Sequence, residues 1–177
     1  MWCGTGKTRT FTIDLFINNE QTNVIVFPSL GLINQYCNDY ALSTEEPFKT
    51  EFEKYKCLAF CSDDDGKLKS KGKIQFTTDE KKLNTFLKKK NKKIILVTYQ
   101  SFEKFINICI EKNININNLI FDEAHHILSG SEDYDGNQNG IKYIVFNNPE
   151  LDNIVDKTRF YTATPVNKNG IIMYDRD

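Results

Sequence analysis

The sequence predicts an α/β domain in which helices cover both faces of a parallel sheet. Apolar runs of four to eight residues, rich in β-branched and aromatic side chains, recur along the chain, and amphipathic segments separate them. Alternation of this kind is typical of βαβ units, whose strands pair in parallel. The 177 residues, 40% of them hydrophobic, are enough for one domain with a buried core.

Each predicted element follows from a local pattern. Buried strands are expected at 23–28, 57–62, 93–99, 117–123 and 158–165. Amphipathic helices are expected at 7–18, 29–42, 78–90 and 101–112. Thr77 and Glu80 have the spacing of a capping box for the third of these helices. The polar, glycine-rich stretches 62–73 and 129–140 are predicted to be surface loops.

Composition and charge exclude several classes of protein. The apolar runs are far shorter than the roughly 20 residues that a membrane-spanning helix needs. The five cysteines show no paired spacing, which argues against a disulfide framework or a zinc ribbon and predicts reduced thiols in the cytoplasm or nucleus. A net charge of -1 neither indicates nor excludes a nucleic-acid partner, because such binding needs only a local positive face.

A phosphate-binding loop is indicated by the stretch GTGKT, residues 4–8, which a helical pattern follows. Glycines let the backbone turn so that its N–H groups face phosphate oxygens, and the helix directs its positive end at the same anion. Lys7 is placed to reach the β- and γ-phosphates of a nucleotide, and the Thr8 hydroxyl to bind Mg²⁺. For this motif alone, a chance turn before a helix is the alternative. The predicted nucleotide-binding residues are Gly4, Thr5, Gly6, Lys7, Thr8 and Arg9.

The start of the chain predicts that it is a piece of something longer. A phosphate loop normally follows a strand, yet Met1 already stands within the loop, so the first strand of the sheet is expected to be missing. A fragment, a split gene and a mis-assigned start are three open explanations.

Two adjacent acids end the predicted strand in LIFDEAHH, residues 119–126. Asp122 is placed to hold Mg²⁺, and Glu123 to polarise an attacking water. In-line displacement at phosphorus needs both tasks, which one carboxylate cannot easily combine. His126 is interpreted as a polar residue that starts the next turn.

GTGKT, DEAH and TATP occur in that order, each beside a predicted strand, and the chain from 1 to 165 thereby resembles the first RecA-like domain of superfamily 2 DEAD/DEAH-type helicases. CGTGKT and DEAHH are frequent in the branch that includes helicase subunits of restriction enzymes. Two further stretches, VFPSLGLINQ and VTYQSF, resemble motifs on the nucleic-acid side. The resemblance implies a RecA-like P-loop ATPase domain that uses ATP and Mg²⁺ to move on nucleic acid, DNA in preference to RNA.

The resemblance also implies roles for individual residues. Lys7 and Glu123 would be catalytic, with His125 linking the ATP site to the rest of the machine, and Thr8 and Asp122 would hold the metal. A second RecA-like lobe, absent from this chain, would supply an arginine finger. The residues expected to contact nucleic acid or to couple it to hydrolysis are Pro28, Ser29, Gln35, Thr98, Gln100, Ser101, Thr162 and Thr164.

Strand direction supports this placement independently, because ligands of open parallel sheets bind beyond the carboxyl ends of the strands, where these motifs lie. The lysine-rich run 81–93 precedes its strand and belongs at the opposite rim. It is interpreted as a solvated helix end whose lysines complement the helix dipole, with a nucleic-acid patch as the alternative. Two other functions are alternatives: a non-catalytic remnant that keeps the motifs, and a kinase or GTPase, which the DEAH and TATP stretches disfavour.

Overall fold

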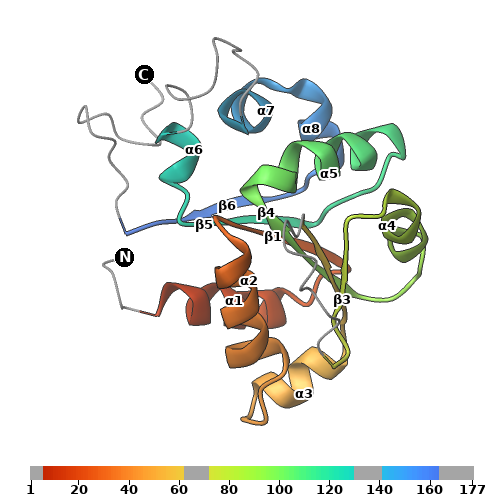
Figure 1. The fold of residues 1–177 in the computed structure, drawn as a ribbon. Helices are drawn as coiled ribbons and strands as arrows, with labels where there is room; N and C mark the ends of the chain where they lie inside the picture. The colour runs from red at the N-terminus through yellow and green to blue at the C-terminus, as the bar shows by residue number, and fades with distance from the viewer. Residues whose placement is uncertain (1–5, 62–71, 130–140, 164–177) are drawn as a thin grey trace.

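The computed structural model describes residues 6–61, 72–129 and 141–163. Gly4, Thr5 and Thr164 lie outside these ranges, as do nearly all of the two predicted surface loops and any strand before the phosphate loop. Within the described residues, six strands form one parallel sheet in the order β3-β2-β4-β1-β5-β6 (Figure 1). The strands are β1 (Thr22–Phe27), β2 (Lys56–Phe60), β3 (Gln75–Thr77), β4 (Lys93–Thr98), β5 (Asn118–Asp122) and β6 (Thr158–Tyr161).

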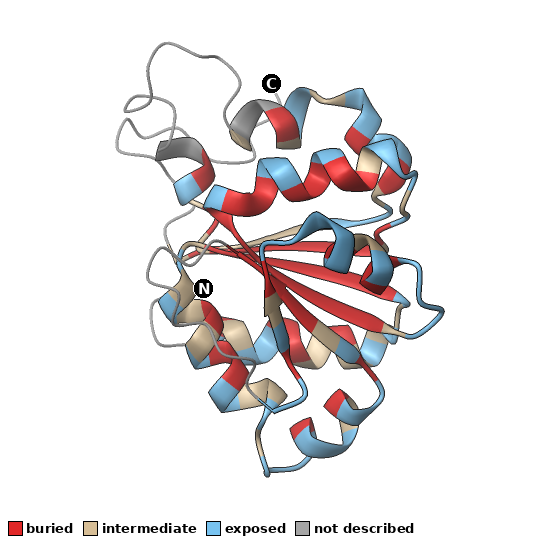
Figure 2. Cartoon of the chain, turned by 45° about the vertical axis from the view of Figure 1, so that its right-hand side comes forward, coloured by how far each residue is buried: buried red, intermediate tan, exposed pale blue. Residues whose placement is uncertain are grey.

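Helices cover both faces of the sheet, as Figures 1 and 2 show. One face carries α1 (Lys7–Asn18), α2 (Leu30–Tyr36), its π-helical continuation η1 (Cys37–Ala41) and α3 (Phe48–Glu53). The other carries α4 (Glu80–Leu87), α5 (Tyr99–Glu111), α6 (His126–Ser129), α7 (Ile141–Asn147) and α8 (Pro149–Ile154). Described residues include no helix long and apolar enough to cross a membrane.

The central strand shows why the sheet needs both layers. All six residues of β1 are buried, and successive side chains point to opposite faces. Val24 and Val26 therefore join the core under α5, while Ile25 and Phe27 join the core over α1 and α2. A strand buried on both faces reads as a continuous apolar run, which is the pattern of a parallel sheet.

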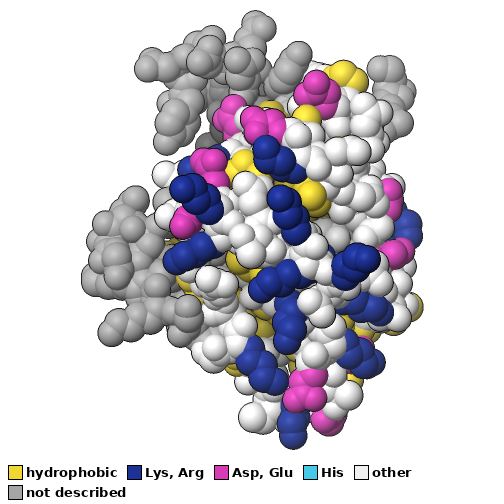
Figure 3. Space-filling model, turned by 90° about the vertical axis from the view of Figure 1, so that its right-hand side faces the viewer, with side chains coloured by type: hydrophobic (Ala, Val, Ile, Leu, Met, Phe, Trp, Pro, Cys, Tyr) yellow, Lys and Arg dark blue, Asp and Glu magenta, His cyan; other side chains and the backbone are white. Residues whose placement is uncertain are grey.

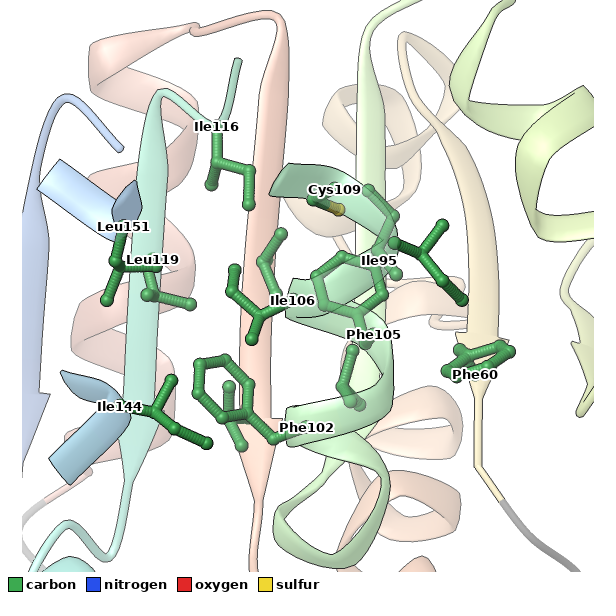
Figure 4. Close-up of a cluster of buried hydrophobic side chains, with 14 of the residues drawn as sticks. Phe60, Ile95, Phe102, Phe105, Ile106, Cys109, Ile116, Leu119, Ile144 and Leu151 are labelled. Atoms are coloured by element: carbon green, nitrogen blue, oxygen red, sulfur yellow. The ribbon is translucent and has the colours of Figure 1, made fainter. Parts of the chain in front are cut away.

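The core under α5 explains the helical pattern predicted there. Phe102, Phe105, Ile106 and Cys109 are fully buried at helical spacing and point at the sheet (Figure 4). Leu151 of α8 closes the same cluster from the side. Burial of each such side chain contributes about 1.5–3 kcal/mol, so this face fixes α5 on the sheet.

The structure corrects the sequence-based expectations in several places. Helices α3, α6, α7 and α8 were not predicted, because none is longer than 7 residues and so short a segment gives little helical period. A sixth strand, β3, was not predicted, because only three residues pair with β2. The capping box is wrong: Asp79 is the N-cap of α4, and its Oδ1 accepts from the Lys81 N–H at 2.8 Å. Thr77 ends β3 instead, and its hydroxyl accepts from the Asp79 N–H.

At the amino-terminal rim, buried amides tie neighbouring strands together. Asn118 of β5 donates to Asn23 Oδ1 of β1 at 2.7 Å, and both side chains are fully buried. Arg159 of β6 donates to Asn118 Oδ1, and its Nε lies 3.3 Å from Asp14 Oδ2 of α1. This chain of contacts joins three strands and a helix at the rim opposite the predicted site.

Candidate nucleotide site

The first turn of α1 has the backbone of an anion-binding helix start. Gly6 precedes the helix with φ 78° and ψ 29°, a left-handed conformation that costs a glycine little. Among the described residues, no side chain caps this helix at Gly6, so its first N–H groups can donate to a bound anion. Phe11 and Leu15 anchor α1 on the sheet, and this positions the N-terminus at the carboxyl rim.

The acids lie where β5 ends. Asp122 is the last residue of β5 and is 5% exposed, and Glu123 follows with φ 47°. A positive φ is uncommon for a residue with a side chain, and such strain is concentrated at functional sites. The turn is fixed from both sides, because the Glu123 N–H donates to Asp122 Oδ1 and the Ala124 N–H donates to the Tyr161 carbonyl of β6.

The structure brings the loop lysine and the acids together. Lys7 is 8% exposed, and its Nζ lies 3.1 Å from Glu123 Oε1. These residues are more than a hundred positions apart in the sequence, yet α1 and β5 present them at one rim of the sheet. Lys7 therefore lies beside the acid turn, as the sequence predicts, and the joint role of these residues at a bound nucleotide stays a prediction.

Asp122 is held in an environment that disfavours its charge. Burial, followed by the charge of Glu123, raises its pKa to about 6, and Lys7 and the Glu123 N–H only partly oppose this. A carboxyl group with such a pKa gains most from a cation, because the cation offsets the cost of burying the charge.

His125 connects the acid turn to the end of β6. Its Nδ1 lies 3.1 Å from Thr162 Oγ1 and 3.4 Å from Glu123 Oε2. Burial and the adjacent His126 lower the pKa of His125, although Glu123 opposes this, so the neutral ring is favoured at physiological pH. His125 thus contacts both the acid turn and the residue after β6, and its linking role stays a prediction.

Sequence reasoning missed two supporting residues. The Tyr99 hydroxyl donates to the Asp122 carbonyl at 3.0 Å, which ties the start of α5 to the acid turn. The Thr12 hydroxyl donates to the Thr8 carbonyl at 2.6 Å, and its Oγ1 lies 3.4 Å from the Tyr36 hydroxyl oxygen, which ties the first turns of α1 to α2. For Tyr99, its position directly after a strand of the site was the available signal; a bond between Thr12 and Tyr36 has no signature in the sequence.

Protein ligands alone do not form a metal centre in the described residues, where no group of three or more acidic, histidine or cysteine side chains gathers. Magnesium at a phosphate loop does not require one, because it keeps several waters and takes few protein ligands beside phosphate oxygens. The buried Asp122 carboxyl beside the N-terminus of α1 fits that arrangement, and Thr8, half-buried in the first turn, is the predicted hydroxyl ligand.

The residues expected on the nucleic-acid side divide into two groups. Ser29, Gln35 and Gln100 are exposed near the carboxyl rim, and Pro28 is half-buried. Thr98 and Ser101 are buried, and the Thr98 hydroxyl donates to Ser101 Oγ at 3.2 Å. Thr162 is buried against His125. The Ser29 hydroxyl accepts from the Leu32 N–H as the cap of α2.

Comparisons with known proteins agree with this geometry. The sequence model of the family described as "Type III restriction enzyme, res subunit" matches residues 1–167. No curated protein matches the chain significantly.

Two solved structures share the fold. A nuclease-deletion mutant of the Type ISP restriction-modification enzyme LlaGI, in complex with a DNA substrate mimic, matches all of this chain with 22% identity and a TM-score of 0.62. The ATP-dependent Type ISP restriction-modification enzyme LlaBIII, bound to DNA, matches 93% of it with 19% identity and a TM-score of 0.57. The chain corresponds to only 16% and 11% of those two chains.

Proposed function

Because the chain belongs to the family of type III restriction enzyme res subunits, we propose that it is the ATP-binding lobe of a DNA translocase or helicase. The observation that supports this most is the approach of Lys7 Nζ to within 3.1 Å of Glu123 Oε1, since it unites a phosphate loop with an acid pair. In phosphoryl transfer these parts must surround one triphosphate.

Each residue has a task in this proposal. The first N–H groups of α1 and the Lys7 ammonium bind the phosphates of ATP. Glu123, which is 27% exposed, accepts a proton from the attacking water. Asp122 and Thr8 would hold Mg²⁺, which neutralises charge on the phosphates when bound. His125 carries the state of Glu123 to Thr162 and thus to β6.

The partners are part of the same proposal. DNA is expected along the exposed polar residues of the carboxyl rim, where Ser29, Gln35 and Gln100 offer hydroxyl and amide groups to a phosphate backbone. A second RecA-like lobe is expected to face Glu123 and supply an arginine, a contribution worth about 10³–10⁵ in rate in phosphoryl-transfer systems.

Paired substitutions test the assignment. We expect Lys7→Ala to weaken Mg-ATP binding at least tenfold by calorimetric titration, because the phosphates lose their buried cation. Glu123→Gln should keep ATP affinity within a few-fold of wild type and abolish hydrolysis, measured as single-turnover release of labelled phosphate with DNA present. Equal turnover by Glu123→Gln and the wild type would refute the role of Glu123.

A non-catalytic interaction module is the second candidate, and the Lys7–Glu123 ion pair is the observation that accommodates it, because the pair neutralises both groups. This function predicts ATP binding without hydrolysis even when a second lobe and DNA are supplied. Turnover under those conditions that Glu123→Gln abolishes would exclude it.

A further inference from the structure

A surface outside the proposed ATP site carries a dense positive charge. Seven of the 23 Lys and Arg residues fall within 80–93, although the chain has a net charge of -1. We define the α4 lysine cluster as the exposed residues Lys81, Lys82, Lys88, Lys89 and Lys90. Lys and Arg side chains dominate the middle of the face on this side of the molecule, and Asp and Glu lie mainly toward its margins (Figure 3).

The cluster stands on a rigid support. Leu83, Phe86 and Leu87 are buried and fix one side of α4 against the core, so its lysines face outward. At the turn that follows, the Lys56 N–H of β2 donates to the Lys92 carbonyl at 2.8 Å. Exposed Lys56 thus extends the same positive surface onto the neighbouring strand.

In the part of the chain that the structure describes, the side chains of the α4 lysine cluster form no ion pair. The lysine ion pairs that the described residues form are those of Lys7, Lys54, Lys73, Lys104 and Lys157. The two acids at the start of α4 are already engaged, since Asp79 caps the helix and Glu80 pairs with Lys104 at 3.0 Å. The positive charge of the cluster is therefore not neutralised by the described acids and is available to a partner.

The helix dipole does not explain the cluster. Lysines near the C-terminus of a helix complement the dipole, which accounts for Lys88. Lys81 and Lys82 lie in the first turn of α4, where positive charge is unfavourable, and Lys90 lies beyond the helix end. The dipole therefore gives no reason for Lys81, Lys82 or Lys90, so a role other than capping is indicated.

From these features we propose that the α4 lysine cluster binds the phosphate backbone of duplex DNA, without reading its sequence. None of the exposed large hydrophobic residues among those described, Ile17, Leu42 and Phe146, lies on α4 or in the turn after it. Protein–protein interfaces usually have an apolar or aromatic residue at their centre, and proteins that bind single strands stack the bases on exposed aromatic rings. A row of ammonium groups suits the charge of a duplex, which needs neither.

The location makes this a second DNA contact. In the sequence, α4 lies between β3 and β4, so it returns the chain from the carboxyl rim of the sheet to the amino rim. It does so at the edge of the sheet where β3 lies. The choice of DNA as ligand rests on the proposed function, whereas the surface itself lies apart from Lys7 and Glu123. A duplex held here would add affinity that does not depend on nucleotide.

The test measures binding of a fluorescent 20-base-pair duplex to the 177-residue chain by anisotropy over a series of salt concentrations. The variant Lys88→Gln/Lys89→Gln is compared with Lys54→Gln/Lys157→Gln, which loses the same charge at lysines that already pair with Glu51 and Glu20. Each lost phosphate contact lowers the slope of log K against log salt by about 0.9. We expect the first variant to lose several-fold in affinity and about two units of slope, and the control to match the wild type.

Further arms fix the identity of the ligand. Two duplexes of unrelated sequence should bind equally, and poly-glutamate of matched charge should bind more weakly than the duplex. Wild-type affinity and slope in Lys88→Gln/Lys89→Gln would overturn the proposal, as would tighter binding of poly-glutamate, which would assign the surface to an acidic protein. Mg-ATP affinity of this variant should be unchanged, so failure here is distinct from failure at Lys7 or Glu123.

Discussion

Glu123 is the residue at which the local constraints of the site meet. Its backbone has φ 47°, and its carboxylate oxygens lie 3.1 Å from Lys7 Nζ and 3.4 Å from His125 Nδ1. The turn that holds it is fixed by Asp122 on one side and by the Tyr161 carbonyl on the other. A strained residue with this many contacts is held in a defined position, which a group that activates water requires.

Asp122 provides a pH test at the residue scale. Its pKa is raised to about 6, so the folded chain binds a proton that the unfolded chain has already lost. This contribution to stability is fully present below the usual carboxyl pKa near 4 and is lost as the pH rises through about 6. Asp122→Asn should therefore flatten the fall in unfolding free energy between pH 4 and 7, measured by urea denaturation. Asp152→Asn removes a carboxyl group at an exposed position and serves as the matched control.

The affinity for Mg²⁺ at Asp122 should rise with pH, whereas the stability contribution of this carboxyl group falls. Ionised Asp122 is the form that would bind Mg²⁺, so the Mg²⁺ dependence of ATP affinity should strengthen as the pH rises through about 6 and then level off. An Mg²⁺ dependence that stays constant from pH 5 to 8 would contradict the role of Asp122.

At the scale of elements, the rim opposite the site holds the strands in register. Asn23, Asn118 and Arg159 link β1, β5 and β6 through side-chain hydrogen bonds, and the two asparagines are fully buried. A one-residue slip of a strand would turn its side chains to the wrong face, so such a network protects the placement of Asp122 at the far end of β5.

Loss of Asn118 should therefore be costly. Asn118→Ala removes the donor to the fully buried Asn23 Oδ1, and an unsatisfied buried polar group costs about 1–3 kcal/mol. Arg159 loses one acceptor but keeps its contact with Asp14. Asn115→Ala is the matched control, because Asn115 is exposed and a surface substitution changes stability by about 0.5 kcal/mol or less. Urea denaturation followed by circular dichroism compares the two. Equal stability of both variants would show that the amide network is dispensable.

For the whole molecule, the elements that could be predicted are those whose apolar residues form a continuous run or recur at helical spacing. The five predicted strands and the four predicted helices are present, because continuous apolar runs and one-sided helix faces report burial directly. The strand β3 was missed because three residues give no period. The burial of Thr98 and Ser101 was also missed, since a hydroxyl after a strand has the same sequence signature whether it faces solvent or a neighbouring side chain.

The central claim, that Lys7 and the acids Asp122 and Glu123 share one phosphate site, was predicted from the chemistry of the residue types rather than from the spacing of apolar residues. The residue types in GTGKT and LIFDEAHH indicated one phosphate site, and strand direction placed both stretches at the carboxyl rim. The distance between the two stretches in space is set by the packing of α1 against β1 and β5, and only the structure could provide it.

A crystal structure of the Glu123→Gln variant with ATP and Mg²⁺ tests that claim most directly. We expect one triphosphate at the N-terminus of α1, with Lys7 Nζ at hydrogen-bonding distance, about 3 Å, from its phosphate oxygens and the Asp122 carboxylate beside the metal. A triphosphate bound elsewhere on the chain, or one that engages Lys7 while the metal lies remote from Asp122, would contradict it.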